Sequence, residues 1–165
     1  MKVVKVFKEN KQFTLFSILA LIVVGVAVFA PQIAPYDPLD AVMLESLQAP
    51  SSAHPFGTDK LGRDLLSRVI FGTRTSLVMT LCLVAVIFVI GTFLGVIAGY
   101  FGGIVDGVIM RIADMMISFP GLVLAIAIAG MLGPNLVNAV ISIAAVSWTK
   151  YARLARSMVL RVKKN

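Results

Sequence analysis

The sequence has few of the side chains on which most enzymes and metal sites depend. Its 165 residues include one cysteine, Cys82, and one histidine, His54. A single cysteine excludes an intramolecular disulfide and leaves a metal or redox centre without a partner thiol. His54 is followed by a proline and by scattered carboxylates that have no firm ligand spacing. We therefore expect neither a catalytic residue nor a bound metal in this chain.

Charge is also scarce, and this excludes a water-soluble globule. Only 14% of the residues are charged and 59% are hydrophobic, and the mean hydropathy is +0.96. Too little polar surface remains to cover a soluble domain of this length, so we expect an integral membrane protein. The net charge of +7 does not indicate nucleic acid, because ten of the fifteen basic residues lie in two terminal clusters beside apolar runs. Anchoring at membrane lipid explains these clusters better.

The first apolar run follows a basic N-terminus. Residues 1–12 contain four lysines and are expected to lie in the cytoplasm. The apolar part, Phe13 to Ala30, would be about 27 Å long as a helix, close to a hydrocarbon core of about 30 Å. Residues 13–36 are therefore predicted as the first span. A cleaved signal peptide is the alternative, but the length of the run and the proline that follows it favour an uncleaved anchor.

Residues 37–74 form the one sizeable polar region. Together with the residues from Pro31 onward, this stretch has five acidic and four basic side chains, and its negative balance predicts a position outside the cytoplasm. Prolines recur every few residues in its first part and exclude a helix there. Near its end, apolar residues from Leu65 to Phe71 alternate with polar ones at helical spacing. This pattern predicts a short amphipathic helix at the membrane interface.

The next uncharged run is predicted to return the chain to the cytoplasm as a second span over residues 75–99. Within it, Gly91, Gly95 and Gly99 recur every four residues and would lie on one helix face. Small residues at this spacing let another helix approach closely. A phosphate-binding loop is the alternative, but no Lys-Ser or Lys-Thr pair follows the glycines. We therefore interpret them as a packing face.

Two further spans are predicted, over residues 112–132 and 135–152. Arg111 and Asp114 stand three residues apart at the start of the third span and are expected to pair on one helix face, as a structural ion pair or at a gate. Pro120 should kink this span. The fourth span is short, so Lys150 would extend its side chain towards the headgroups. Four spans place both ends of the chain inside.

The last stretch of the chain is basic and amphipathic. It contains six Lys or Arg from Lys150 onward and no acidic residue. The apolar residues among them recur at helical spacing and form one stripe. These are Tyr151, Leu154, Ala155, Met158 and Val162. Two interpretations follow: an ordinary cytoplasmic anchor, or a helix that binds a cytoplasmic partner.

Five motifs in this order closely resemble one family over essentially the whole chain. They are F-A-P-Q-I-A-P-Y-D-P, H-P-F-G-T-D-K-L-G-R-D-L-L-S-R, G-Y-F-G-G-I-V-D, M-R-I-A-D and W-T-K-Y-A-R-L-A-R-S-M-V-L. The chain resembles the inner-membrane permease subunits of dipeptide, oligopeptide and nickel ABC importers. This resemblance implies an all-α membrane protein of the type I importer fold, with about four of six expected helices present here. It also implies that the second motif carries family positions outside the membrane: Gly57, Thr58, Asp59, Gly62, Arg63 and Asp64.

The resemblance also implies partners. The permease would sit in the inner membrane of a prokaryote as a multi-pass protein with a cytoplasmic N-terminus, paired with a second permease subunit as a heterodimer. Two cytoplasmic ATPase subunits would hold ATP and magnesium, and a solute-binding protein would lie outside. Residues 153–165 would begin the cytoplasmic segment that couples to the ATPase. The predicted coupling residues are Tyr151, Arg153, Leu154, Arg156 and Leu160.

The energy source predicted from the residues agrees with this resemblance. No span has an ionisable group at its centre, which disfavours a proton- or sodium-coupled carrier or a free-standing channel. The chain has no phosphate-binding loop of its own, so it is not expected to hydrolyse ATP. Short peptides are favoured over nickel as the solute because no array of metal ligands is present.

One departure from the family keeps an alternative open. Members of the family continue with a segment of the glutamate-alanine-alanine type and two more helices, whereas this sequence ends at Lys163-Lys164-Asn165. The alternative is a truncated, transport-incompetent fragment that only associates with partner helices.

Overall fold

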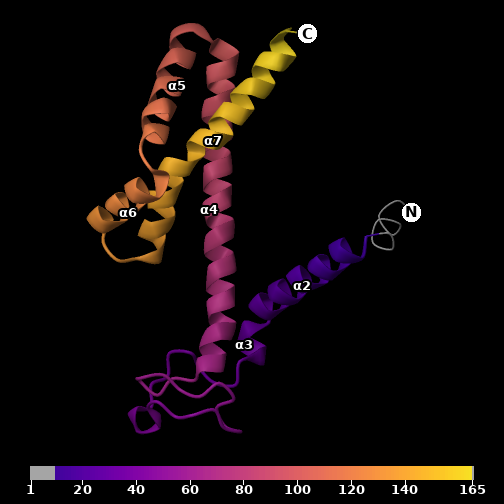
Figure 1. Ribbon diagram of the computed structural model, residues 1–165, viewed down its shortest axis with the longest axis vertical. Helices are drawn as coiled ribbons and strands as arrows, with labels where there is room; N and C mark the ends of the chain where they lie inside the picture. Colours follow the sequence, from indigo (N-terminus) through magenta and orange to yellow (C-terminus); the bar gives the residue numbers. More distant parts are fainter. Residues whose placement is uncertain (1–9, 165) are drawn as a thin grey trace. The chain divides into compact units, whose positions relative to one another are not determined.

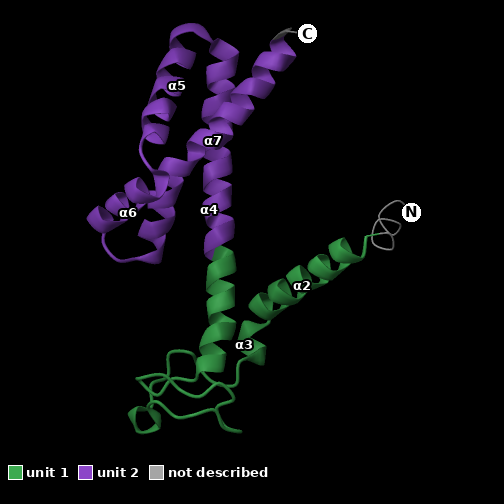
Figure 2. Ribbon diagram, in the orientation of Figure 1, with its two compact units in different colours: residues 1–78 green, residues 79–165 purple. Residues whose placement is uncertain are grey.

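The computed structural model describes residues 10–164, and their regular structure is helical apart from one isolated bridge between Thr58 and Asp64. The chain forms two compact units, Met1–Val78 and Met79–Asn165, which Figure 2 shows in different colours. The long helix α4 (Leu65–Phe101) begins in the first unit and ends in the second. The expected all-α class is confirmed for the described residues.

The first unit begins with the apolar helix α2 (Lys11–Val28), followed at once by the four-residue helix α3 (Ala30–Ile33). Nearly all of the large side chains of α2 are exposed, and only Ala27 is buried. An apolar helix without a protein-facing side is suited to contact with lipid. Pro31 stands in the first turn of α3, where its missing N–H leaves no helical hydrogen bond unmade.

Residues 34–64, which we call the polar loop, contain only one short helix, η1 (Met43–Glu45). Backbone hydrogen bonds tie the loop to itself, among them Leu47 N–H to Asp59 O at 3.0 Å and Thr58 N–H to Gln48 O at 3.1 Å. The last residue of the loop, Asp64, directly precedes α4. An ordered loop thus forms where the prolines predicted no helix, but the single turn α3 at Ala30–Ile33 departs from that prediction, because a proline is tolerated in a first turn.

The short interfacial helix predicted for Leu65 to Phe71 is not a separate element. These residues are the first two turns of α4, which runs for 37 residues without a break. No proline interrupts this stretch, and the hydroxyls of Thr73 and Thr75 are bonded to carbonyls one turn earlier instead of ending the helix. At 1.5 Å per residue α4 is about 55 Å long, so it extends beyond a hydrocarbon core of about 30 Å.

The second unit contains the end of α4 and three further helices, α5 (Gly103–Ser118), α6 (Gly121–Leu132) and α7 (Leu136–Lys164). Gly102 and Gly103 have positive φ angles of 66° and 51°, which reverse the chain so that α5 runs back beside the end of α4 (Figure 1). Ala113, Trp148 and Ala152 form the buried core, against which residues from α4 and α5 pack. Three helices therefore meet at one point.

The kink predicted at Pro120 is confirmed, and it is a right-angled break. The axes of α5 and α6 differ by 92°. Phe119, the residue before the proline, is extended, with φ −91° and ψ 146°, as the proline ring requires. The predicted third span, 112–132, is thus not one straight helix, and α5 begins nine residues earlier than expected, at Gly103.

Helix length and composition support two membrane spans in the described part of the chain, α2 and α4, or three if α5 and α6 form one broken span. The fourth predicted span lies in α7, which does not reach the same hydropathy. Polar residues such as Asn138, Lys150 and Arg153 dilute its apolar character. The four spans that we predicted therefore exceed the number that these criteria support.

Candidate functional site

Three glycines of α4 form the face on which α7 lies (Figure 1). A methyl group at Gly91 would come within 2.6 Å of the carbonyl oxygen of Trp148, and one at Gly99 within 2.8 Å of Val159 Cβ. At Gly95 it would collide with the carbonyl oxygen of Ala152. The residues predicted as a packing face thus stand where only glycine lets the two backbones approach this closely.

Arginines of α7 bind the aspartates of α5. Arg156 donates from Nε and Nη2 to the two carboxylate oxygens of Asp106, which is a bidentate pair. One turn earlier, Arg153 Nη2 donates to Asp114 Oδ1. The side chains of the first pair are 34% and 17% exposed, against 47% and 57% for the second. The Asp106–Arg156 pair is therefore less screened by solvent than the Asp114–Arg153 pair.

These contacts correct one prediction and leave a second untested. The expected Arg111–Asp114 pair is wrong, because Asp114 binds Arg153 of another helix and Arg111 has no ion pair among the described residues. Arg153 and Arg156 were expected to couple to a partner, but their guanidinium groups are engaged inside the chain. Spacing along the sequence predicts ion pairs only within one helix. The observed pairs instead join aspartates of α5 to arginines of α7.

Other residues of the predicted coupling segment remain accessible. Leu154, Met158 and Val162 are 54%, 57% and 76% exposed and lie four residues apart on α7. We call these three residues the apolar strip. Tyr151, which is 36% exposed, packs edge-on against Phe88 with ring centroids 6.2 Å apart. The fifth predicted residue, Leu160, is half-buried and lies outside the strip.

The polar loop is held by two carboxylates from the second motif. Asp59 accepts hydrogen bonds from the N–H groups of Leu61 (2.8 Å) and Arg63 (3.0 Å) and from the guanidinium groups of Arg63 and Arg68. Burial tends to raise the pKa of Asp59, but the hydrogen bonds and the Arg63 charge outweigh it and lower the pKa from 3.8 to about 2. Asp59 is therefore ionised over the whole physiological range.

Asp64 caps the first turn of α4. Its Oδ2 accepts a 2.7 Å hydrogen bond from Ser67 N–H, and its Oδ1 lies 3.0 Å from His54 Nδ1. Both Asp64 and His54 are buried, and the other ring nitrogen of His54 lies 3.4 Å from Glu45 Oε2. Burial tends to raise the pKa of Asp64, but the bonds from Ser67 and His54 outweigh it, so this pKa is lowered. Sequence reasoning identified Asp64 but missed this role for His54, whose partner is ten residues away.

The remaining residues of the motif shape the loop. Gly57 and Gly62 have φ angles of 75° and 74°, and a side chain at either would collide with a backbone carbonyl oxygen. The hydroxyl of Thr58 is hydrogen-bonded to Glu45 O and to Gln48 N–H. Among the described residues, no group of three or more His, Cys, Asp or Glu side chains has an arrangement suited to a metal ion.

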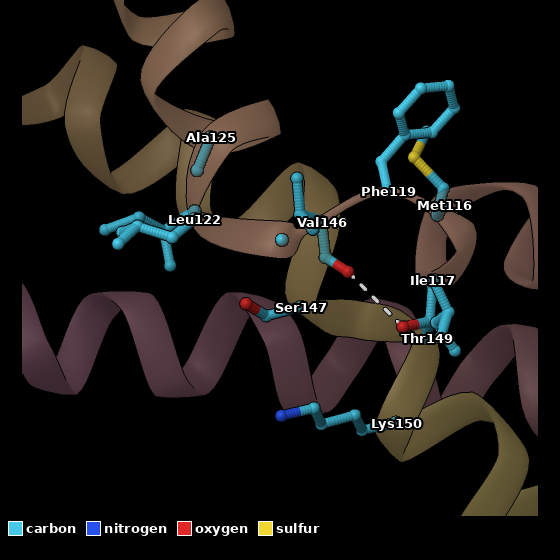
Figure 3. A pocket seen from close by; sticks show the side chains of 11 residues that line it. Met116, Ile117, Phe119, Leu122, Ala125, Val146, Ser147, Thr149 and Lys150 are labelled. Atoms are coloured by element: carbon cyan, nitrogen blue, oxygen red, sulfur yellow. Dashed lines mark hydrogen bonds between the residues drawn. The ribbon is translucent and has the colours of Figure 1, made fainter.

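A cleft of about 380 Å³ lies where the corner between α5 and α6 faces α7. Most of its lining is apolar, and the polar groups come from α7 (Figure 3): Ser147, Thr149 and Lys150. The Thr149 hydroxyl donates to Val146 O at 3.3 Å, so it is already satisfied. Ser147 and Lys150 are the other polar side chains of the lining.

Long apolar helices, two of which pack closely through a glycine face, define a helical membrane protein. Residues 91–164 match the family described as the binding-protein-dependent transport system inner membrane component. Residues 2–50 match the N-terminal transmembrane domain of oligopeptide transport permease C. These two matches, which lie at opposite ends of the chain, support an ABC importer permease of this family. The first match includes the glycine face, both arginine–aspartate pairs and the apolar strip.

Relatives from bacteria are named for several different solutes. The chain is 41% identical to a probable D,D-dipeptide transport system permease protein of Escherichia coli, over 98% of this chain and 54% of the relative. It is 42% identical to a glutathione transport system permease protein of Pectobacterium atrosepticum, over 87% and 48%. A nickel transport system permease protein of Escherichia coli is 38% identical, over 88% and 54%. The chain spans about half the length of these relatives.

Proposed function

We propose that this chain is a permease subunit of an ATP-driven importer and forms half of the translocation pathway for short peptides or nickel. The match of residues 91–164 to binding-protein-dependent permeases supports this proposal most strongly, because these residues form the packed helices of the second unit. The relatives named for dipeptide, glutathione and nickel transport support the solute class. Peptide is favoured over nickel because the described residues offer no metal-ligand cluster.

The partners follow from this role. A second permease subunit completes the pathway, a solute-binding protein delivers the solute from outside, and two cytoplasmic ATPase subunits bind ATP and magnesium. ATP binding in those subunits moves the cytoplasmic end of α7 and switches the permease pair between inward-open and outward-open states. The exposed apolar strip of α7 supports such a contact, because an amphipathic helix docks through residues at this spacing.

The membrane orientation is part of the same proposal. The basic segment at the end of α7 lies in the cytoplasm, and the polar loop, which has five acidic and two basic residues, lies outside. The N-terminal lysines predicted to be cytoplasmic are mostly outside the described residues. The turn at Gly102 and Gly103 is then cytoplasmic, and the turn between α6 and α7 is external.

ATPase stimulation tests the proposal. The gene product that carries this chain would be reconstituted in lipid with its second permease, ATPase and solute-binding subunits. We expect the ATP hydrolysis rate to rise several-fold when the binding protein is loaded with a di- or tripeptide. Assembly without stimulation by any peptide-loaded or nickel-loaded binding protein would instead favour a subunit that only associates.

A further inference from the structure

The cations at the end of α7 divide into two groups with different surroundings. Arg153, Arg156 and Lys163 each bind an acceptor on the hairpin of α4 and α5; Lys163 Nζ donates to Tyr100 O at 3.0 Å. Lys150 and Arg161 are exposed and have no ion pair among the described residues. A helix that served only as a membrane anchor would leave its cations solvated. Three of these cations are instead used within the protein.

Arg156 lies where the three helices of the second unit meet. A methyl group added at Gly99 of α4 would lie 3.2 Å from Arg156 O and 2.8 Å from Val159 Cβ. The Arg156 guanidinium extends in a different direction, to Asp106 in the first turn of α5. Its backbone is thus pressed against α4 while its side chain is held by α5. A change in the direction of α7 would break the ion pair or the glycine contact.

The geometry of the pair favours positioning over partner binding. Both carboxylate oxygens of Asp106 are used by Arg156, and a planar bidentate pair fixes orientation as well as distance. Contact with an ATPase through the same guanidinium would require this pair to open. The apolar strip on α7 is free for such contact without any rearrangement.

We propose that Asp106 and Arg156 form a clasp that fixes the direction in which α7 leaves the helix packing. Arg156 is then a positioning residue, which affects coupling to the ATPase through Asp106 and does not touch the ATPase. The coupling part of this inference rests on the proposed function, whereas the clasp itself does not. Asp114 and Arg153 add a second, more exposed contact to the same helix pair.

The clasp is tested by the distance between α5 and α7 in the complete permease complex. Spin labels at Val108→Cys and Ser157→Cys, both exposed positions, would be read in a Cys82→Ser background. We expect Asp106→Asn and Arg156→Gln each to broaden the distance distribution. The exchanged pair Asp106→Arg with Arg156→Asp should narrow it again. Arg161→Gln, which removes the same charge from an unpaired position, should leave the distribution unchanged.

Coupling is measured separately on the same variants. Asp106→Asn and Arg156→Gln should reduce the ratio of ligand-stimulated to basal ATP hydrolysis by about two- to fivefold, the range for a partly exposed ion pair, while the ATPase subunits still copurify. Arg156→Lys keeps the charge but loses the second hydrogen bond, and it should give an intermediate ratio. Restoration of the ratio by the exchanged pair would show that the two residues act through each other.

Two results would overturn the inference. One is an unchanged distance distribution in both single variants. The other is loss of copurifying ATPase from Arg156→Gln with full retention and full stimulation in Asp106→Asn, which would make Arg156 a contact residue. If the unsubstituted complex shows no stimulation at all, the proposed function fails, and the distance measurement still decides whether the clasp exists.

Discussion

Asp59 and Asp64 are five residues apart, yet each carboxylate holds a different part of the polar loop. Asp59 accepts hydrogen bonds from Leu61, Arg63 and Arg68. Asp64 is hydrogen-bonded both to the first turn of α4 and to His54. Both carboxylates accept bonds that require the ionised form, which is why the pKa of each is lowered. The stability of the loop therefore depends on pH.

Acid should weaken the polar loop. The Asp59 pKa falls from an ordinary value of 3.8 to about 2 on folding, so its contribution to stability is fully present above about pH 4 and is lost as pH falls towards 2. The lowered pKa of Asp64 acts in the same direction. The protection factors of the loop amides, which correct for the intrinsic slowing of exchange in acid, should fall over this range. In Asp59→Asn the loop amides should exchange faster than in the wild type at neutral pH, and their protection should depend less on acid. An equally steep pH dependence would contradict the role assigned to the Asp59 carboxylate.

Asp64→Ala should destabilise the junction between the polar loop and α4. The variant removes the N-terminal cap of α4 and leaves a buried His54 nitrogen without its partner, for a combined cost of about 1–3 kcal/mol. Asp64→Asn is the matched control, because asparagine also caps helices and still offers an acceptor. Thermal unfolding in detergent should rank the stabilities as wild type, Asn, then Ala. Equal melting temperatures for the three proteins would exclude the capping role.

At the scale of helices, α4 and α7 are in contact through backbone because their facing residues are small. Ala152 is completely buried, and Gly91, Gly95 and Gly99 stand opposite α7. Close approach of this kind is stabilised by dispersion and requires a face without side chains. The basic end of α7 is held at a definite position by this contact and by the clasp together.

Gly95→Ala should separate the two helices. The added methyl group would collide with the Ala152 carbonyl oxygen, and backbone cannot rotate out of the way, so we expect a loss of about 1–3 kcal/mol. Gly72→Ala in the same helix is the control, because nothing lies within 4 Å of the added group. Its higher helix propensity should make it neutral or stabilising by up to about 1 kcal/mol. Unfolding of both variants in detergent gives the comparison, and equal effects would contradict the close contact.

Features with local causes were predictable from the sequence at this scale, and features with distant partners were not. Pro120 removes a donor and restricts its neighbour, so a kink could be placed at that residue, although the 92° angle could not. The spacing of the α4 glycines indicated a packing face but not its partner. The Asp114–Arg153 and Asp106–Arg156 pairs join residues 39 and 50 positions apart, beyond what helical periodicity indicates.

At the scale of the whole molecule, the proposed function requires a surface for the ATPase on the end of α7. Leu154→Ser, within the apolar strip, should weaken binding of the ATPase subunits at least about fivefold, as expected for a central apolar contact. Leu44→Ser is the control: this leucine is 97% exposed but belongs to the polar loop, which we place on the other side of the membrane. Quantitative copurification of the ATPase compares the two. A larger loss from Leu44→Ser would reverse the proposed orientation.

Solute uptake into proteoliposomes tests the central claim most directly. The complete complex would be reconstituted with ATP inside the vesicles and a solute-binding protein loaded with labelled dipeptide outside. We predict accumulation of the dipeptide that requires ATP, the ATPase subunits and the binding protein together. Uptake that continues without the ATPase subunits would contradict the account and indicate a free-standing carrier or channel. No uptake under any of these conditions, for peptides or for nickel, would contradict a transport role for the subunit.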